Sequence, residues 1–475
     1  MIEHQKIEIA KRHHEAKFFA EKRLVAEKWF VASVLTGEIR CPPIVRLARL
    51  FLFALFALLT IPLSAQDGDN TVTELKRHDS KHITLTTDID DKDKISDLMA
   101  AFEAAVPQWT KFWRLPEGSL DDWKVDAYVI RNKATFLKAG LIPDSVPNFP
   151  FGYALGQQIF VMEQDSLYYT RHLLLHESVH ALMFKHFGGA GPSWFMEGSA
   201  EMLSVHRLTG SDTQINQPPA DRSSVPYWGR YKLMSERRKA SGIPSLNSVI
   251  EYPRDLNSDV ESYAWSWAAT MMLYNYDDFR DAFYRAAKNG QDEDELFNVK
   301  LRRDLQTQWP VVDARWRLMC NDLNYGFDWS KEKVALSMKD QVWDGSELSI
   351  AVKPDQGWQS IGVRLNKGMK LNVTPSGQCV LGNKPKPWVS EPAGVTIRYH
   401  HGRPLGQLIA CIVDNAPDAK SSDAKTIKPL PIASITKPIQ IPIRENCWLL
   451  FRVNDAPGEL ADNTGAYQIK IQAGR

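Results

Sequence analysis

The sequence predicts an α+β protein in which a small mixed sheet with helices is followed by an all-β sandwich. Residues 66–335 alternate short β-branched runs with long helical patterns. Beyond about residue 340, short strands recur between Gly and Pro residues, a spacing that is typical of β-sandwiches. We therefore expect one domain at 66–335 and a second at 340–475, preceded by a leader at 1–65.

The composition is that of an ordinary folded protein. Of 475 residues, 44% are hydrophobic and 24% are charged, which excludes disordered, collagen-like and coiled-coil classes. Lys and Arg number 58 against 57 Asp and Glu, so no overall positive field exists to hold a phosphate backbone. We expect no nucleic-acid partner.

The leader has the three parts of a secretory signal peptide, within about residues 46–65. Arg46 and Arg49 precede the apolar run LFLFALFALL, and a small-residue ending places cleavage after Ala65. The apolar run is shorter than the roughly 20 residues of a membrane anchor. We expect a secreted, periplasmic or cell-surface protein with no stable membrane span after cleavage. A start codon assigned too far upstream would explain the charged residues 1–45.

The first domain is predicted from strand and helix patterns in chain order. Strands are expected at 124–130 and 158–162, where β-branched and aromatic residues lie between turn residues. Helices are expected at 171–186 and 194–208, which Gly residues follow, and at 263–288, with a break near Asn275.

The sharpest motif is His176-Glu177-Ser178-Val179-His180 inside the apolar helix RHLLLHESVHALMFKHF. Residues four apart on a helix differ by about 40° around its axis. Both imidazoles therefore point the same way and can take one metal ion.

A third ligand is needed because catalytic zinc keeps three protein ligands and one open position. His186 follows His180 by six residues, as in the metzincins, but Met183 stands where those enzymes have a helix-breaking Gly. A continuing helix turns His186 about 240° away from His180. Glu197 follows the glycine-rich turn at 188–191, which lets a second helix fold back. Glu197 is therefore the better of the two candidates.

HESVH followed by WFMEGSAE resembles the gluzincin metallopeptidases, the thermolysin and aminopeptidase-N-like group, and most closely their secreted peptidase-MA-like relatives. The resemblance covers about residues 124–283 and implies His176, His180 and Glu197 as zinc ligands. It also implies hydrolysis of peptide bonds by a zinc-activated water, with Glu177 as general base. The 16 residues between His180 and Glu197 are slightly fewer than in the best-known members.

Two further residues are assigned near this motif. Glu201 lies four residues after Glu197, where it can accept a hydrogen bond from a ligand His, although an exposed helix carboxylate is the alternative. Tyr263 resembles the tyrosine that stabilises the transition state in aminopeptidase-N-like enzymes, although the usual following Gly is missing. A packed core tyrosine is the alternative there.

Residues 152–161 match the edge strand beside the cleft of such a fold. An extended peptide or protein substrate can pair with it through main-chain bonds, although a simple sheet edge explains the segment equally well. The strand that reads a free amino terminus in the aminopeptidases is not found. We therefore expect an endopeptidase.

The last stretch, residues 451–471, places oxygen-bearing side chains around a Pro-Gly turn. Hard oxygen ligands on a tight loop suit Ca²⁺, whereas an Asp- and Asn-rich hairpin turn is the commoner explanation. From about 345 to 473 the chain also resembles the calcium-dependent bacterial galactophilic lectin and its galactose-binding-like relatives. The resemblance implies calcium binding by the side chains of Asp455, Asp462 and Asn463 and by the main chain at Glu459.

The second domain is therefore expected to bind a polysaccharide or a cell-surface glycan. The lectin family's His-Pro-Asp-Gln loop has no counterpart, so galactose specificity is not implied. An alternative function is an inactive peptidase scaffold that serves as an adhesin. A second alternative is a zinc hydrolase that acts on a non-peptide amide or ester. Cys320, Cys379, Cys411 and Cys447 allow disulfides in an exported protein, without a preferred pairing.

Overall fold

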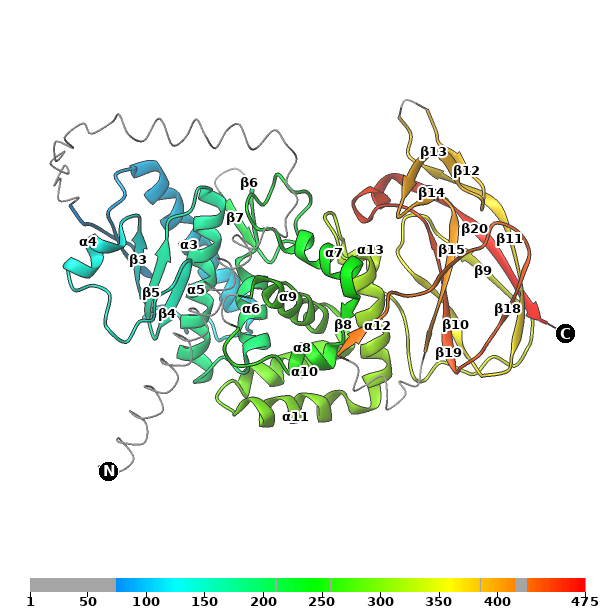
Figure 1. The fold of residues 1–475 in the computed structure, drawn as a ribbon, viewed down its shortest axis with the longest axis horizontal. Coiled ribbons are helices and arrows are strands. Elements are labelled where there is room, and N and C mark those ends of the chain that lie inside the picture. The colour runs from blue at the N-terminus through cyan, green and yellow to red at the C-terminus, as the bar shows by residue number, and fades with distance from the viewer. Residues whose placement is uncertain (1–73, 210–211, 257–258, 385, 415–424, 475) are drawn as a thin grey trace, which may run out of the picture. The chain divides into compact units, whose positions relative to one another are not determined.

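The computed structural model describes residues 74–209, 212–256, 259–384, 386–414 and 425–474 (Figure 1). The predicted leader lies outside these residues. The described chain is a mixed α+β structure with several sheets and many helices. No helix in the described ranges combines the length and apolar character that crossing a bilayer requires.

A five-stranded mixed sheet comes first in the chain. Its strand order is β1-β2-β3-β5-β4, in which β2, β3 and β5 run parallel and the two edge strands run antiparallel to their neighbours. The predicted strands at 124–130 and 158–162 are present as β3 and β5. The strand bounds are β1 Lys76–Asp79, β2 Ile83–Thr87, β3 Val125–Ile130, β4 Gly152–Leu155 and β5 Gln158–Met162.

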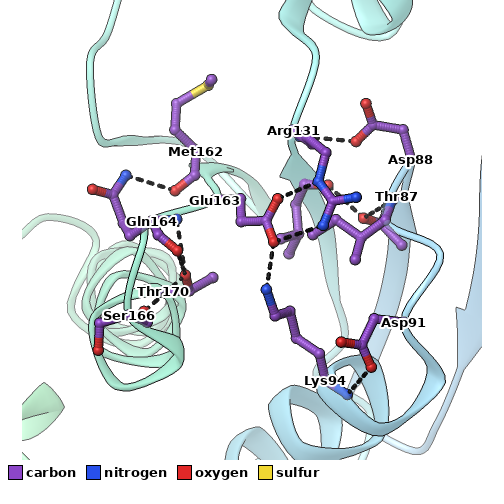
Figure 2. A network of polar contacts seen from close by, with 12 residues as sticks. Thr87, Asp88, Asp91, Lys94, Arg131, Met162, Glu163, Gln164, Ser166 and Thr170 are labelled. Atoms are coloured by element: carbon purple, nitrogen blue, oxygen red, sulfur yellow. Dashed lines mark hydrogen bonds and ion pairs between the residues drawn. The ribbon is translucent and has the colours of Figure 1, made fainter.

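A polar network holds the junction between β5 and the next helix, α5 (Leu167–Phe187). Figure 2 shows the Glu163 carboxylate between Arg131, whose Nε lies 2.6 Å away, and Lys94, whose Nζ lies 2.5 Å away. Beyond Glu163, the backbone N–H of Gln164 donates to Thr170 Oγ1 in the first turn of α5. These contacts tie the sheet to the helix that carries the His-Glu motif.

The predicted helices are present with shifted ends. α5 begins four residues earlier than expected and ends at Gly188, whose φ of 71° is left-handed and suits Gly. The segment at 263–288 is two helices, α9 (Val260–Asn275) and α10 (Asp277–Lys288), which meet at Tyr276 near the expected break.

The helix predicted at 194–208 is shorter than expected. α6 (Ser193–Ser204) ends at Val205, and the next residues form β6 (His206–Thr209), which pairs antiparallel with β7 (Asp212–Ile215). The pairing of β6 with β7 satisfies backbone groups that a longer helix would have bonded internally.

Seven further helices complete the described part of the chain. They are α3 Lys92–Phe112, α4 Lys133–Lys138, α7 Arg230–Ser241, α8 Leu246–Ile250, α11 Asp294–Leu305, α12 Trp309–Asp322 and α13 Trp329–Glu332, with a 3₁₀ turn at Gln306–Gln308. One large buried apolar cluster joins all of these helices except α4 to the mixed sheet, and α7, α8 and α12 contact α9 directly. α9 is hydrophobic on all sides, as expected for a helix in the middle of a core.

Two antiparallel sheets follow, with orders β10-β19-β15-β17 and β12-β11-β20-β9, the latter extended by β18 beside β11. Both sheets contribute to a single buried cluster. A second 3₁₀ turn spans Pro457–Asp462. The strands of these two sheets are β9 Leu348–Val352, β10 Gln359–Leu365, β11 Lys370–Leu381, β12 Val389–Ser390, β15 Leu408–Asp414, β17 Ile432–Ser434, β18 Ile439–Pro442, β19 Cys447–Val453 and β20 Asn463–Ala473. β13 (Val395–His400) and β14 (Arg403–Leu405) form a separate antiparallel pair.

The C-terminal sheets also contact the helices directly. β16 (Thr426–Ile427), which lies between β15 and β17 in the chain, pairs antiparallel with β8 (Ile243–Pro244). Trp448 and Leu450 of β19 belong to the same buried cluster as the helices. The four cysteines from Cys320 onward are buried and free, so none of them forms a disulfide in this structure.

Candidate metal centre

Helix α5 brings three histidines onto one face. His172, His176 and His180 are spaced four residues apart, and each is at most 6% exposed. The helix is buried from Tyr169 to Met183, so its apolar residues pack on several sides while the histidine face meets α6. The rings of His176 and His180 lie 4.9 Å apart between centroids. The sequence spacing therefore produces the common orientation that the motif requires.

Helix α6 places Glu197 against this face. Glu197 Oε2 lies 3.0 Å from His176 Nε2 and 3.4 Å from His180 Nε2, and its side chain is 12% exposed. Burial alone would raise the pKa of Glu197, but His180 and His176 lower it to about 2 through their charges and hydrogen bonds. The carboxylate is therefore ionised next to both rings.

The three side chains form a group that fits a transition-metal ion. One ligand atom from each of His176, His180 and Glu197 lies within 4.8 Å of the others. The donor set consists of two imidazole nitrogens and one carboxylate oxygen. This set suits a zinc ion that keeps its fourth coordination position open. A second group of possible ligands among the described residues is His172, His176 and Glu201. His186, the alternative third ligand, belongs to neither group.

Glu177 lies beside this group and is 7% exposed. Burial raises the pKa of the Glu177 carboxyl to about 8, Glu197 adds to the effect, and His180 opposes it. A carboxyl group with a raised pKa, next to a candidate metal group in a cavity, has the character of a proton-transferring residue.

Glu201 occupies the centre of a buried polar cluster behind the candidate ligands. Its carboxylate accepts from Trp228 Nε1 at 2.5 Å and from Arg230 Nε at 3.1 Å, and it lies 3.6 Å from His176 Nδ1 and 3.4 Å from His172 Nε2. Burial would raise the pKa of Glu201, but Arg230 and His172 hold it well below the usual value. Glu201 is fully buried, unlike the exposed carboxylate considered as its alternative.

Tyr263 lies at the N-terminal end of α9 and faces the same cavity. Its ring centroid is 6.2 Å from that of His176. The cavity has a volume of about 720 Å³, and its lining includes Glu177, Glu197, Tyr263 and the first two residues of β4, Gly152 and Tyr153. A substrate in this cavity would reach the general-base candidate and the tyrosine together.

Sequence reasoning missed three residues of the polar cluster. His172 could have been predicted from the sequence, because it precedes His176 by four residues and so lies on the same face of the helix. Trp228 and Arg230 could not have been predicted, since they follow Glu201 by 27 and 29 residues and contact it only in the folded chain.

Only two of the residues expected to bind calcium, Asp455 and Asn463, contact each other in the structure. Asp455 and Asn463 are buried, with Asn463 Nδ2 donating to Asp455 Oδ2 at 2.8 Å, and Asn463 Oδ1 has no hydrogen-bond partner. The Glu459 side chain pairs with Arg398, which does not involve the main-chain carbonyl expected to bind calcium, and Asp462 is exposed. Among the described residues, no group of three His, Cys, Asp or Glu side chains gathers at this loop.

Comparisons with known proteins give no family assignment. No protein-family model matches the chain, and no curated protein sequence matches it.

Among solved structures, the N-terminal domain of EclA, a PllA-like lectin, is 14% identical and has a TM-score of 0.20; the match covers 29% of this chain and 99% of that one. IMPa from Pseudomonas aeruginosa in complex with an O-glycopeptide is 11% identical with a TM-score of 0.17, covering 55% of this chain and 24% of IMPa. A structure of the IMPa metallopeptidase with T-antigen is 11% identical with a TM-score of 0.17, covering 73% and 37%. Likenesses this weak carry no functional argument.

Proposed function

We propose that this chain is an exported zinc metallopeptidase that cleaves within peptide chains. The observation that carries the proposal is the meeting of His176, His180 and Glu197 within 4.8 Å, with the Glu177 carboxyl beside them. A core-packing role does not account for two imidazoles and two carboxylates in one cavity, because buried polar groups are costly unless they serve as ligands or partners.

In this proposal His176, His180 and Glu197 hold zinc, and Glu201 fixes the orientation of His176. When bound, the ion supplies Lewis-acid chemistry that polarises a carbonyl and acidifies a water molecule. Glu177 accepts the proton and returns it to the leaving amine, a role that its raised pKa suits. The Tyr263 hydroxyl donates a hydrogen bond to the oxyanion.

The free edge of the mixed sheet supports an extended peptide as substrate. β4 is the edge strand, pairs only with β5 in the described sheet, and contributes lining residues to the cavity. Main-chain pairing with such an edge binds many sequences, which suits an endopeptidase of broad preference.

The experiment compares purified wild-type protein with Glu177→Gln on casein and on quenched fluorescent peptides. We expect about one zinc per chain in both proteins and a loss of about 10²- to 10⁴-fold in kcat for the variant. Chelation should abolish the activity and added zinc restore it. Activity that survives Glu177→Gln would contradict the mechanism. Hydrolysis of amides or esters but not peptides would favour the non-peptide hydrolase.

For the C-terminal loop we propose calcium binding at Asp455 and Asn463, in support of attachment to a glycan. The supporting observations are the unpartnered Asn463 Oδ1 and the Asp455 carboxyl, whose pKa burial raises to about 6. A bound cation would give Asn463 Oδ1 a partner. It would also favour the ionised form of Asp455, whose two oxygens already accept hydrogen bonds from the Ala456 N–H and from Asn463 Nδ2. Added Ca²⁺ should raise the melting temperature of the wild type but not of Asp455→Ala. Equal shifts in the two proteins would contradict the calcium site.

Glycan binding by a protein that hydrolyses none of these substrates would favour the alternative function as an adhesin.

A further inference from the structure

Gly152 is the first residue of the edge strand β4 and lines the candidate active-site cavity. Met162, the last residue of β5, donates its backbone N–H to the carbonyl of Phe151, which directly precedes β4. Hydrogen-bonded and non-hydrogen-bonded pairs alternate along an antiparallel ladder, so the peptide groups of Gly152 and Ala154 face the free edge. Gly152 therefore lies at the point where an extended peptide would meet the sheet.

The absent side chain of Gly152 leaves room for Glu177. A Cβ atom on residue 152 would lie 2.9 Å from both Cγ and Cδ of Glu177, and closer still to its Oε1. The three nearest atoms all belong to Glu177, so the candidate metal ligands are not the groups that a methyl would first displace.

Backbone conformation does not explain this glycine. The backbone at Gly152 is not in the left-handed region, unlike that of Gly140 or Gly156. An alanine could adopt the same dihedral angles without strain. Space next to the Glu177 carboxylate is therefore the feature that only glycine provides.

The position of that carboxylate matters for the proposed chemistry. A general base must lie within hydrogen-bond reach of the proton that it accepts. A displacement of about 1 Å can cost about 10²-fold in rate. Glu177 is 7% exposed and lies on a buried helix, so a methyl added at residue 152 would force the Glu177 side chain to move from its present position.

We propose that Gly152 is a positioning residue for Glu177: by lacking a side chain, it lets the edge strand approach the carboxylate and fixes where that carboxylate sits relative to the bound peptide. This inference rests on the proposed peptidase function. It adds a determinant outside the His-Glu motif and places it on the strand that would pair with the substrate.

The test is a double-mutant cycle of Gly152→Ala and Glu177→Asp, with zinc content, kcat and KM measured for all four proteins. We expect Gly152→Ala to retain zinc and to lose about 10²-fold in kcat with little change in KM. Asp is one methylene shorter than Glu and withdraws the carboxylate from the new methyl. In the Glu177→Asp background, the same Gly152→Ala change should therefore cost less than about tenfold.

Equal losses in kcat in the two backgrounds would overturn the inference, because the methyl would then act on the substrate and not on Glu177. No loss in kcat in either background would also overturn it, because the methyl would then have no effect. Gly140→Ala is the control. A Cβ atom on residue 140 would meet nothing within 4 Å. The φ of 68° strains the backbone of an alanine there, but this strain does not reach Glu177, so kcat should not change.

A crystal structure of Gly152→Ala provides a readout that does not depend on activity. We expect a displaced Glu177 side chain with His176, His180 and Glu197 in place, and an unmoved Glu177 would overturn the inference. If the wild type hydrolyses no peptide, the proposed function fails, while this structural comparison still decides the role of Gly152.

Discussion

The Tyr263 hydroxyl is held in its protonated form, which a hydrogen-bond donor requires. Burial raises the pKa of Tyr263, and the carboxylates of Glu197 and Glu177 raise it further. A hydroxyl that donates to a developing oxyanion acts in the transition state more than in the bound substrate.

We therefore predict that Tyr263→Phe lowers kcat by about 10²- to 10³-fold with little change in KM. Zinc content should remain that of the wild type. Tyr231→Phe is the matched control, because Tyr231 is fully buried and its hydroxyl has no hydrogen-bond partner in the described chain. Steady-state kinetics on one quenched peptide decides the matter, and an unchanged kcat for Tyr263→Phe would reduce Tyr263 to a packing residue.

At the scale of elements, the site depends on how closely α6 packs against α9. α6 carries Glu197 and Glu201, and α9 carries Tyr263. Gly198 lies at the contact between the helices, where an added Cβ would meet the Ser266 carbonyl and come within 2.7 Å of Thr270 Cγ2. The backbones of the two helices are in contact only because residue 198 has no side chain.

Gly198→Ala should therefore push the two helices apart. We predict a loss of about 1–3 kcal/mol in the free energy of unfolding, as for overpacked cores. Zinc affinity should also fall, because Glu197 moves with α6. Denaturant unfolding and zinc titration measure the two effects. Ser199→Ala is the control, since the buried Ser199 hydroxyl has no partner and its removal should be close to neutral. Unchanged stability and affinity in Gly198→Ala would refute the close-packing argument.

The elements also show what a sequence can and cannot predict. The helix pattern around the His-Glu motif indicated α5 because its signal is local, and the spacing of His176 and His180 follows from helix geometry. The end of α6 at Ser204 was missed, since β6 forms through pairing with β7 rather than through a stop residue. The closeness of Gly152 to Glu177 was missed for the same reason: the two residues come from different elements and meet only in the folded chain.

At the scale of the whole molecule, a buried ion cluster joins the C-terminal sheets to the helices. Arg452 of β19 contacts Glu332 of α13 at 2.7 Å and Asp322 of α12 at 3.2 Å. Trp358 Nε1 donates to the same Asp322 carboxylate at 2.5 Å. Arg452 is 3% exposed and Glu332 is 5% exposed, so water compensates little for the loss of a partner. The described residues accordingly belong to one compact unit.

Removing Arg452 should destabilise both halves of this unit together. Arg452→Met leaves two buried carboxylates without a cation, for which we predict a loss of about 3–5 kcal/mol in the free energy of unfolding. Because the cluster lies between helices and sheets, far-ultraviolet circular dichroism and tryptophan fluorescence should report one coincident, shifted transition.

The matched control for this variant is Arg398→Met, which removes the exposed pair between Arg398 of β13 and Glu459 of the 3₁₀ turn at Pro457–Asp462. Exposed pairs contribute at most about 1 kcal/mol, so this variant should unfold close to the wild type. If Arg452→Met unfolded no earlier than Arg398→Met, the cluster would contribute nothing to the junction. If its two probes separated into distinct transitions, the helices and the sheets would be independent domains, and the predicted boundary between 335 and 340 would then mark a cooperative border as well as a change in composition.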